Sequence, residues 1–237
     1  MENALHISIR GYWLSPEIEQ KYLNWTLEAY SSVLTGIPQV LGTDQYRIMK
    51  GRPEYPGFIT IQHFESLESA VDYYNSQDYR AVDLDRKTTF GDLYKWVWHA
   101  QYDLLEGVNQ NRESAAPLMH LEGFNLSPES NDKYNNWFNK WGHSTYLPLL
   151  LKNAGLTGFA FYRFKVKSLQ GSSFHLPDDV AYPQYLSIYE FENLKAFNTF
   201  ENSLELAAFR GATEVGFANS LTPKWYVQYQ LMKSRRK

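Results

Sequence analysis

The chain contains no cysteine, so disulfides, thiolate nucleophiles, cysteine-held iron–sulfur clusters and cysteine zinc sites are all excluded. Several short catalytic motifs are missing as well. There is no glycine-rich phosphate loop, no Gly-x-Ser-x-Gly elbow, no His-Glu-x-x-His and no dinucleotide fingerprint. Histidine, carboxylate, tyrosine, serine, threonine and lysine side chains remain as possible carriers of chemistry.

Basic charge and long apolar runs are also scarce. The chain has 23 Lys and Arg against 26 Asp and Glu, a net charge of -3, and this balance argues against a nucleic-acid partner. No stretch approaches the roughly 18 consecutive apolar residues that a membrane helix needs. The first residues lack the cationic and apolar parts of a signal peptide. We therefore expect no nucleic-acid or membrane partner and a cytoplasmic location.

What the sequence does contain is an internal repeat. Residues 11–34 align without gaps on 123–146, with 10 identities in 24 positions. Residues 56–105 align on 183–232, with 13 identities in 50. Self-similarity of this kind indicates a duplicated structural unit. With 237 residues, of which 43% are hydrophobic and 16% aromatic, the chain is long enough for two small globular domains.

The repeat predicts where the domains begin and end. We assign residues 1–108 to the first repeat and residues 117–237 to the second. The polar stretch 109–116 between them is typical of a linker.

Periodicity predicts the same order of elements in both halves. Leu5, Ile7 and Ile9 alternate with polar residues, as in a half-buried strand, and Pro16 after Ser15 favours a helix start. Further strands are predicted over 43–49, 58–64 and 98–102, and over 159–166, 185–191 and 225–229, with second helices starting after Ser66 and Asn193. The order strand, helix, strand, strand, helix, strand is the ferredoxin-like fold. The predicted fold class is α+β: two tandem ferredoxin-like (βαββαβ) repeats whose antiparallel sheets lie face to face as an intramolecular α+β barrel.

A short pattern recurs in register in the two halves. It consists of Tyr22-x-x-Trp25, Pro38 and Tyr46-Arg47 in the first half, and of Tyr134-x-x-Trp137 and Tyr162-Arg163 in the second. This pattern resembles the dimeric α+β barrel superfamily, especially its EthD-like members. The resemblance implies a barrel interior that holds a small, often aromatic or polyketide-like molecule. The fused chain could be a monomeric pseudo-dimer or could associate further into a homo-oligomer.

The sequence departs from the EthD-like pattern at one position. Such proteins commonly carry a histidine a few residues after the helix tryptophan. The first half has Tyr30 and Ser32 there, whereas the second has His143, one residue later than the pattern.

Candidate site residues follow from the predicted faces of the strands. If Ile7 and Ile9 pack on the helices, their polar neighbours face the barrel interior. The candidate catalytic residues are His120, His143, Glu122 and Arg10, and the candidate substrate-binding residues are His6, Gln62, Arg163, Tyr189 and Trp141. Arg10 and Glu122 occupy equivalent positions, so they can pair, orient a substrate or lie at the solvent rim. His120 can be a general base or a hydrogen-bonded core residue. No metal site is predicted.

These features lead to one leading expectation and three alternatives. The leading one is a cofactor-independent enzyme that acts on a hydrophobic aromatic or polyketide-like molecule in the barrel interior by acid-base chemistry, through cyclisation, dehydration or isomerisation. The alternatives are a cofactorless monooxygenase of the same superfamily, a haem enzyme of chlorite dismutase type with His143 or His120 as axial ligand, and a non-catalytic ligand-binding barrel.

Overall fold

The structure of the chain is a computed structural model that describes residues 5–109, 115–150, 152, 155–167, 169, 182–217 and 220–236. The strands are β1 (His6–Leu14), β2 (Val40–Lys50), β3 (Phe58–Phe64), β4 (Tyr94–Asn109), β5 (Leu118–Leu126), β6 (Leu156–Val166), β7 (Tyr185–Phe191) and β8 (Leu221–Arg236). The α-helices are α1 (Pro16–Gly36), α2 (Leu67–Asn75), α3 (Gln77–Phe90), α4 (Asn131–Trp137), α5 (Leu147–Leu150), α6 (Leu194–Glu201) and α7 (Leu204–Phe217). The remaining elements of the described residues are the short 3₁₀ turns η1 (Gly91–Leu93) and η2 (Pro128–Ser130) and a π-helix η3 (Phe138–Tyr146).

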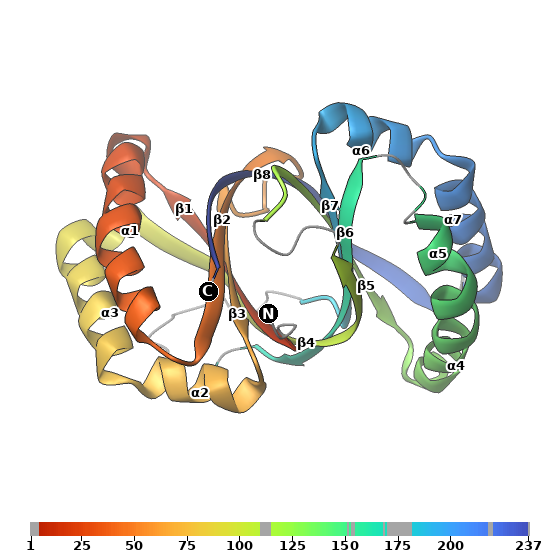
Figure 1. Ribbon diagram of the computed structural model, residues 1–237, viewed down its shortest axis with the longest axis horizontal. Helices are drawn as coiled ribbons and strands as arrows, with labels where there is room; N and C mark the ends of the chain where they lie inside the picture. Colours follow the sequence, from red (N-terminus) through yellow and green to blue (C-terminus); the bar gives the residue numbers. More distant parts are fainter. Residues whose placement is uncertain are drawn as a thin grey trace.

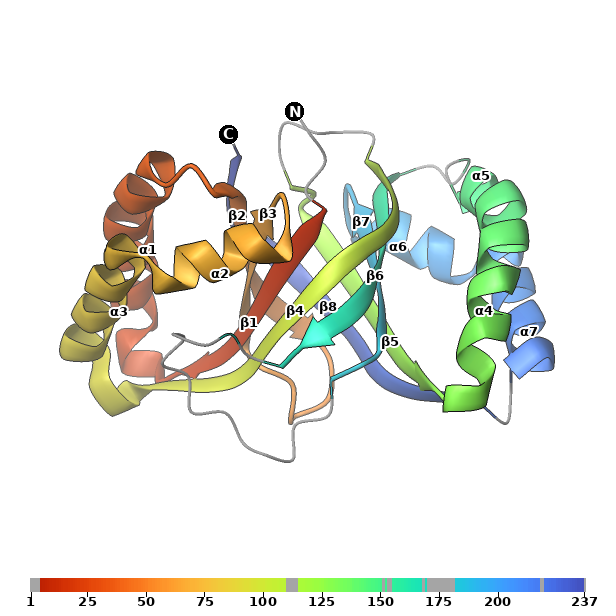
Figure 2. The ribbon, with the colours of Figure 1, turned by 90° about the horizontal axis from the view of Figure 1, so that it is seen from below.

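The strands form a closed barrel in the order β1-β3-β2-β8-β5-β7-β6-β4. Each half contributes a four-stranded antiparallel sheet, and antiparallel pairing of β2 with β8 and of β4 with β6 joins the two sheets. Helices α1 to α3 cover one side of the barrel and α4 to α7 cover the other (Figures 1 and 2). The predicted fold class is confirmed. The domain limits stay a prediction.

Side-chain caps fix the starts of the second helices as the sequence predicts. The Ser66 hydroxyl accepts a hydrogen bond from the backbone N–H of Ser69 at 3.2 Å, at the start of α2. In the other half, Asn193 Oδ1 accepts one from the N–H of Ala196 at 2.9 Å, at the start of α6. These bonds satisfy backbone donors that have no partner within the helix. Among the described residues, no helix is long and apolar enough to cross a membrane.

The predicted orientation of the strands is wrong: the apolar residues face the barrel interior. Ile7 and Ile9 are fully buried in one cluster with Leu121 of the other half. At the centre of this cluster the rings of Trp98 and Trp225 stack with centroids 4.0 Å apart. The interior is shut off from water and offers few polar partners, so the more apolar face of each sheet turns inward.

The polar residues of the same strands face the helices, where they find hydrogen-bond partners. On β1, for example, the Ser8 hydroxyl lies 2.7 Å from the hydroxyl of Tyr74 on α2. Both faces of the sheet are therefore buried. The alternation of apolar and polar residues along the strand separates an apolar face from a hydrogen-bonded face, and does not separate a packed core from an open cavity. A ligand site among these polar residues has to lie between a sheet and its helices.

Close approach of β1 to the turn before β3 requires glycine at position 11. A Cβ atom there would lie 2.6 Å from Pro56 Cγ and 3.0 Å from Trp98 Cβ. We expect Gly11→Ala to lower the free energy of unfolding by about 1–3 kcal/mol, because the core must shift to admit the methyl group. Denaturant unfolding measures this change. The matched control is Gly211→Ala in α7, where a Cβ meets no atom within 4 Å, so stability should rise by up to about 1 kcal/mol. Equal effects of the two changes would contradict the packing argument.

Candidate functional site

A cavity of about 470 Å³ lies in the second half of the chain, between the sheet and the helices. Its walls are mostly aromatic, and its non-aromatic polar side chains come from β5, β7 and α7. The residues that line it include Glu122, Phe124, Tyr134, Phe138, Phe159, Phe161, Ser187, Tyr189, Phe209, Arg210, Thr213 and Tyr226. A volume of this size lies within the range of roughly 300–1,000 Å³ that is typical of small-molecule sites.

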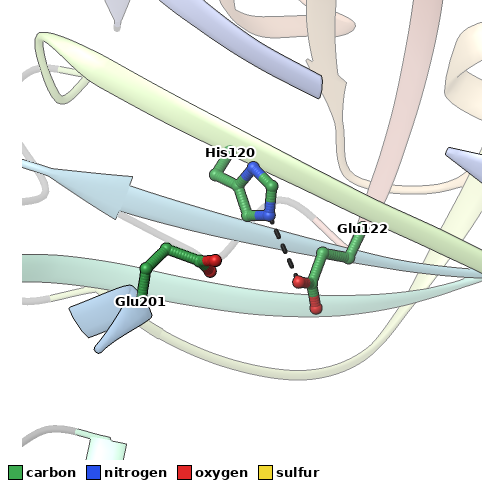
Figure 3. A group of neighbouring side chains, drawn as sticks. All are labelled: His120, Glu122 and Glu201. Carbon is green, nitrogen blue, oxygen red and sulfur yellow. Dashed lines mark hydrogen bonds and ion pairs between the residues drawn. The ribbon is translucent and has the colours of Figure 1, made fainter. Parts of the chain in front are cut away.

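A charged network lies at one end of this cavity. His120 and Glu122 both lie on the helix-facing side of β5, and His120 Nε2 donates to Glu122 Oε1 at 3.2 Å (Figure 3). The same carboxylate oxygen accepts a hydrogen bond of 2.5 Å from the guanidinium of Arg210 on α7. The side chain of Glu122 is 21% exposed, whereas that of His120 is fully buried.

Arg210 links this pair to a second carboxylate. Its guanidinium nitrogen lies 3.0 Å from Glu201 Oε1, and the hydroxyl of Tyr226 donates to Glu201 Oε2 at 2.6 Å. The Tyr226 ring in turn packs edge-on against the ring of His120, with centroids 4.5 Å apart. The network thus contains two carboxylates, one guanidinium, one imidazole and one phenol.

The electrostatics keep the ion pair charged. Burial alone would raise the pKa of Glu122, but its hydrogen bond to His120 and the charges of His120 and Arg210 outweigh burial and lower that pKa. Burial alone would likewise lower the pKa of Arg210, yet the charges and hydrogen bonds of Glu122 and Glu201 raise it. Burial raises the pKa of Tyr226, and its hydrogen bond to Glu201 raises it further, so the phenol stays protonated.

The lowered pKa of Glu122 predicts a pH-dependent contribution to stability. A carboxyl group whose pKa is lower in the folded state stabilises the fold above its unfolded pKa, about 4.3 for glutamate, and loses that contribution as pH falls through the folded pKa. We therefore expect the difference in unfolding free energy between the native chain and Glu122→Gln to be constant near neutral pH and to shrink below about pH 4. Urea unfolding at a series of pH values measures it. A difference that stays constant down to pH 3 would contradict the assigned shift.

The carboxylate of Glu122 and the guanidinium of Arg210 can both contact the same atom of a bound ligand, one as proton acceptor and the other as cation. Within the described part of the chain, both contacts of Glu122 go to Oε1, so Oε2 makes no hydrogen bond with a protein group. Arg210 lines the cavity beside it. A substrate hydroxyl at this end could pass its proton to Oε2 while the guanidinium stabilises the anion that forms.

His120, Glu122 and Glu201 could also be considered as metal ligands, because one ligand atom from each lies within 4.8 Å of the others (Figure 3). However, Arg210 bridges the two carboxylates, with contacts to Glu122 Oε1 and Glu201 Oε1. The guanidinium therefore supplies the positive charge that a metal ion would bring. We interpret the group as an ion-pair network.

Some of the residues predicted from the sequence meet at this cavity. Glu122 and Tyr189 line it. His120 does not line it but forms a hydrogen bond with Glu122. The side chains of Trp141 and His143, in the π-helix, lie outside the described residues.

The structure does not bring the other predicted residues to this cavity. In the first half, His6 Nδ1 lies 2.7 Å from Asp103 Oδ1, and Gln62 accepts a hydrogen bond of 3.1 Å from a tyrosine hydroxyl. Arg163 lies on β6 and is not among the lining residues. Arg10 is buried beneath the helices of the first half. It cannot meet Glu122, because the two sheets turn their helix-facing sides away from each other.

Sequence reasoning missed Arg210, Glu201 and Tyr226, although the repeat contains a signal for them. In the alignment of 56–105 with 183–232 these residues fall opposite Asp83, Tyr74 and His99. Each pair differs in charge or chemistry. Such differences at aligned positions are a signal in the sequence that could have singled out these three residues.

Comparison with known proteins shows the fold. No protein-family model and no curated protein sequence matches the chain. Among solved structures, a candidate monooxygenase from Fusobacterium nucleatum has a TM-score of 0.66 at 8% identity, over 100% of this chain and 96% of that one. The chain shares the ferredoxin-like α+β barrel fold. An anthrone oxidase-like protein has a TM-score of 0.59 at 11% identity (98% and 93% covered), and a chlorite dismutase variant from Candidatus Nitrospira defluvii has 0.61 at 10% (98% and 93% covered).

The sequence leaves open a haem enzyme with His143 or His120 as axial ligand, and the structure tests this for the histidines whose side chains it describes. Among the described side chains, no histidine lines the cavity. His120 is fully buried and its Nε2 is engaged by Glu122. The described residues therefore do not present an axial imidazole to a haem in this cavity, and we derive no step through one.

Proposed function

We propose that the chain is an enzyme that removes a proton from an aromatic small molecule bearing a hydroxyl or keto group, bound in the cavity of the second half. The observation that carries the proposal is the ion pair of Glu122 and Arg210 at one end of an otherwise aromatic cavity. The site thus moves from the barrel interior to the space between sheet and helices.

The walls of the cavity favour a flat aromatic substrate. Phe124, Phe161 and Phe209 are among the rings that line it, and rings of this kind bind an aromatic ligand through stacked or edge-on contacts. Ser187 lies opposite Glu122 in the pairing of β5 with β7, so it can position a second polar group of the substrate.

The two charged residues have separate roles. Glu122 accepts the substrate proton at Oε2, and Arg210 stabilises the phenolate or enolate that is left. A carboxylate with a lowered pKa is a weak base, so the substrate must form a stabilised anion. Tyr226 and Glu201 hold the guanidinium in place through their own hydrogen bond.

Cyclisation, dehydration and isomerisation can all start from such an anion. Reaction with O₂ is a second candidate, favoured by the likeness to monooxygenase and anthrone oxidase-like structures. With an anthrone as substrate, the methylene carbon would lose two hydrogens and gain one oxygen atom as a carbonyl, and the other oxygen atom would leave with those hydrogens as water. The electrons pass from the substrate anion to O₂, so this oxidation balances without a cofactor.

The experiment uses anthrone and a panel of hydroxylated naphthalenes as probes. Binding is measured by calorimetry, and exchange of the acidic carbon-bound hydrogens with D₂O is followed without oxygen. We expect a bound probe to exchange faster with the native chain than with Glu122→Gln. O₂ uptake in air then separates oxidation from the other reactions. Equal exchange with both proteins would reduce the chain to a binding protein, and failure of every probe to bind would overturn the substrate class.

A further inference from the structure

The cavity of the second half is far larger than the space at the corresponding place in the first half. There, a volume of about 20 Å³ is open between the sheet and helices α1 and α3. The guanidinium of Arg86 lies 4.7 Å from the ring centre of Tyr94, and the ring of Tyr94 lies 5.0 Å from that of Tyr22. These long side chains fill the space between α3 and β4 that would otherwise admit a ligand.

Shorter side chains occupy two of these positions in the second half. In the alignment of the repeats, Thr213 falls opposite Arg86. Leu221 falls opposite Tyr94 in the same way, and both shorter residues line the cavity. Thr213 lies on α7 three residues beyond Arg210, which is about one helical turn. The space for a ligand therefore extends along α7, from Arg210 past Thr213.

The third position is a tyrosine in both halves. Tyr134, the counterpart of Tyr22, lines the cavity and is only 1% exposed. Its ring packs against other aromatic rings, and no group in the described part of the chain forms a hydrogen bond with its hydroxyl. Burial, and then the nearby Tyr185, raises the pKa of Tyr134 above its ordinary value. The hydroxyl therefore stays protonated and can donate a hydrogen bond to a ligand.

Tyr134 lies away from the charged end of the cavity. Its ring centroid is 5.4 Å from that of Phe124 on β5 and 5.4 Å from that of Tyr185 on β7. Phe124 and Tyr185 pair across the sheet, and Phe124 lies two residues beyond Glu122. Two residues span about 7 Å along a strand. One cavity thus presents a proton acceptor and, about 7 Å along the sheet, a hydrogen-bond donor.

We propose that Tyr134 determines the specificity of the site by donating a hydrogen bond to a second oxygen of the substrate, and that Thr213 leaves the space for the ring that carries this oxygen. The inference rests on the proposed function and narrows its substrate class. The second oxygen is a ring carbonyl about 7 Å from the hydroxyl that faces Glu122. A neutral carbonyl suits this end because the carboxylate of Glu214, next to Thr213, also lines the cavity and would repel an anion.

Two probes of one skeleton test the role of Tyr134. One is a hydroxytetralone whose hydroxyl is para to the ring carbon that bears the carbonyl, and the other is the tetrahydronaphthol that lacks only the carbonyl. Calorimetry with the whole chain measures the ratio of their dissociation constants. Tyr134→Phe should reduce the preference for the ketone by about 3–10-fold, the usual net contribution of one hydrogen bond. Tyr22→Phe, the matched change in the first half, should leave the preference unchanged.

Substitutions at Thr213 test the space beside Tyr134. Thr213→Met introduces a longer side chain into the cavity and should weaken the binding of both probes by about 10-fold or more. Thr213→Val keeps the volume and should keep both affinities. It should also keep the native melting temperature, because Thr213 Oγ1 makes no hydrogen bond within the described residues.

The outcomes separate this inference from the proposed function. If both probes bind and Tyr134→Phe retains the native preference, the specificity role of Tyr134 is overturned while the proposed function stands. Native affinities in Thr213→Met would overturn the role of Thr213. If neither probe binds the native chain, the proposed substrate class fails and this inference fails with it.

Discussion

Replacing Glu122 by glutamine should lower the turnover of a cavity-bound substrate by about 10²–10⁴-fold, which is the usual contribution of a positioned general base. Glutamine keeps the shape of the side chain, and its amide oxygen can still accept the hydrogen bond from Arg210. It cannot take a proton from the substrate. The loss should therefore appear in kcat, while the dissociation constant of the substrate changes only a few-fold.

The matched control for this variant is Glu19→Gln. Glu19 lies on α1 in the first half and pairs with Arg47 at 3.0 Å, so it repeats the carboxylate–guanidinium contact at a distance from the cavity. Turnover and binding should both stay unchanged in the control. If Glu122→Gln retained the native kcat, the assignment of Glu122 as the base would be wrong.

The sequence was sufficient for the fold because the same pattern occurs twice. The predicted strands 58–64 and 185–191 agree with β3 and β7, and the caps Ser66 and Asn193 start α2 and α6. These features depend on local periodicity and capping, which a single sequence contains. Closure of the barrel follows from the need of each sheet to cover its second face.

The faces of the strands could not be assigned in the same way. Alternation identifies two faces, but on β1 both are buried, and nothing local says which side the helices cover. Arg210 was missed for a related reason. It projects from α7 toward a strand 88 residues away in sequence, where it contacts Glu122. Only the folded chain, or a comparison of the two repeats position by position, brings such residues together.

The helix after the first strand differs between the two halves in a way that the gapless alignment of 11–34 on 123–146 does not indicate. The structure has a π-helix over Phe138–Tyr146, where the first half has the regular helix α1. A π-helix accommodates an extra residue per turn and often occurs at functional sites. Phe138, its first residue, lines the cavity.

Removing the cation from the network is expected to affect both activity and stability. Arg210→Met should lower turnover by about 10²–10³-fold, because no group then stabilises the anion of the substrate. It should also lower the free energy of unfolding by about 1–3 kcal/mol, since Glu122 and Glu201 lose a charged hydrogen-bond partner and repel each other. Steady-state kinetics and urea unfolding measure the two effects on the same protein.

A second substitution separates these effects. In the Arg210→Met background, Glu201→Gln removes one of the two like charges but still accepts the hydrogen bond from Tyr226. We expect the double variant to be more stable than Arg210→Met alone, which a double-mutant cycle expresses as a coupling between positions 201 and 210. Its turnover should stay low, because the cation that faces the substrate is still missing. Recovery of turnover together with stability would mean that Arg210 serves only the fold, and the chemistry at this site would then rest on Glu122 without the guanidinium.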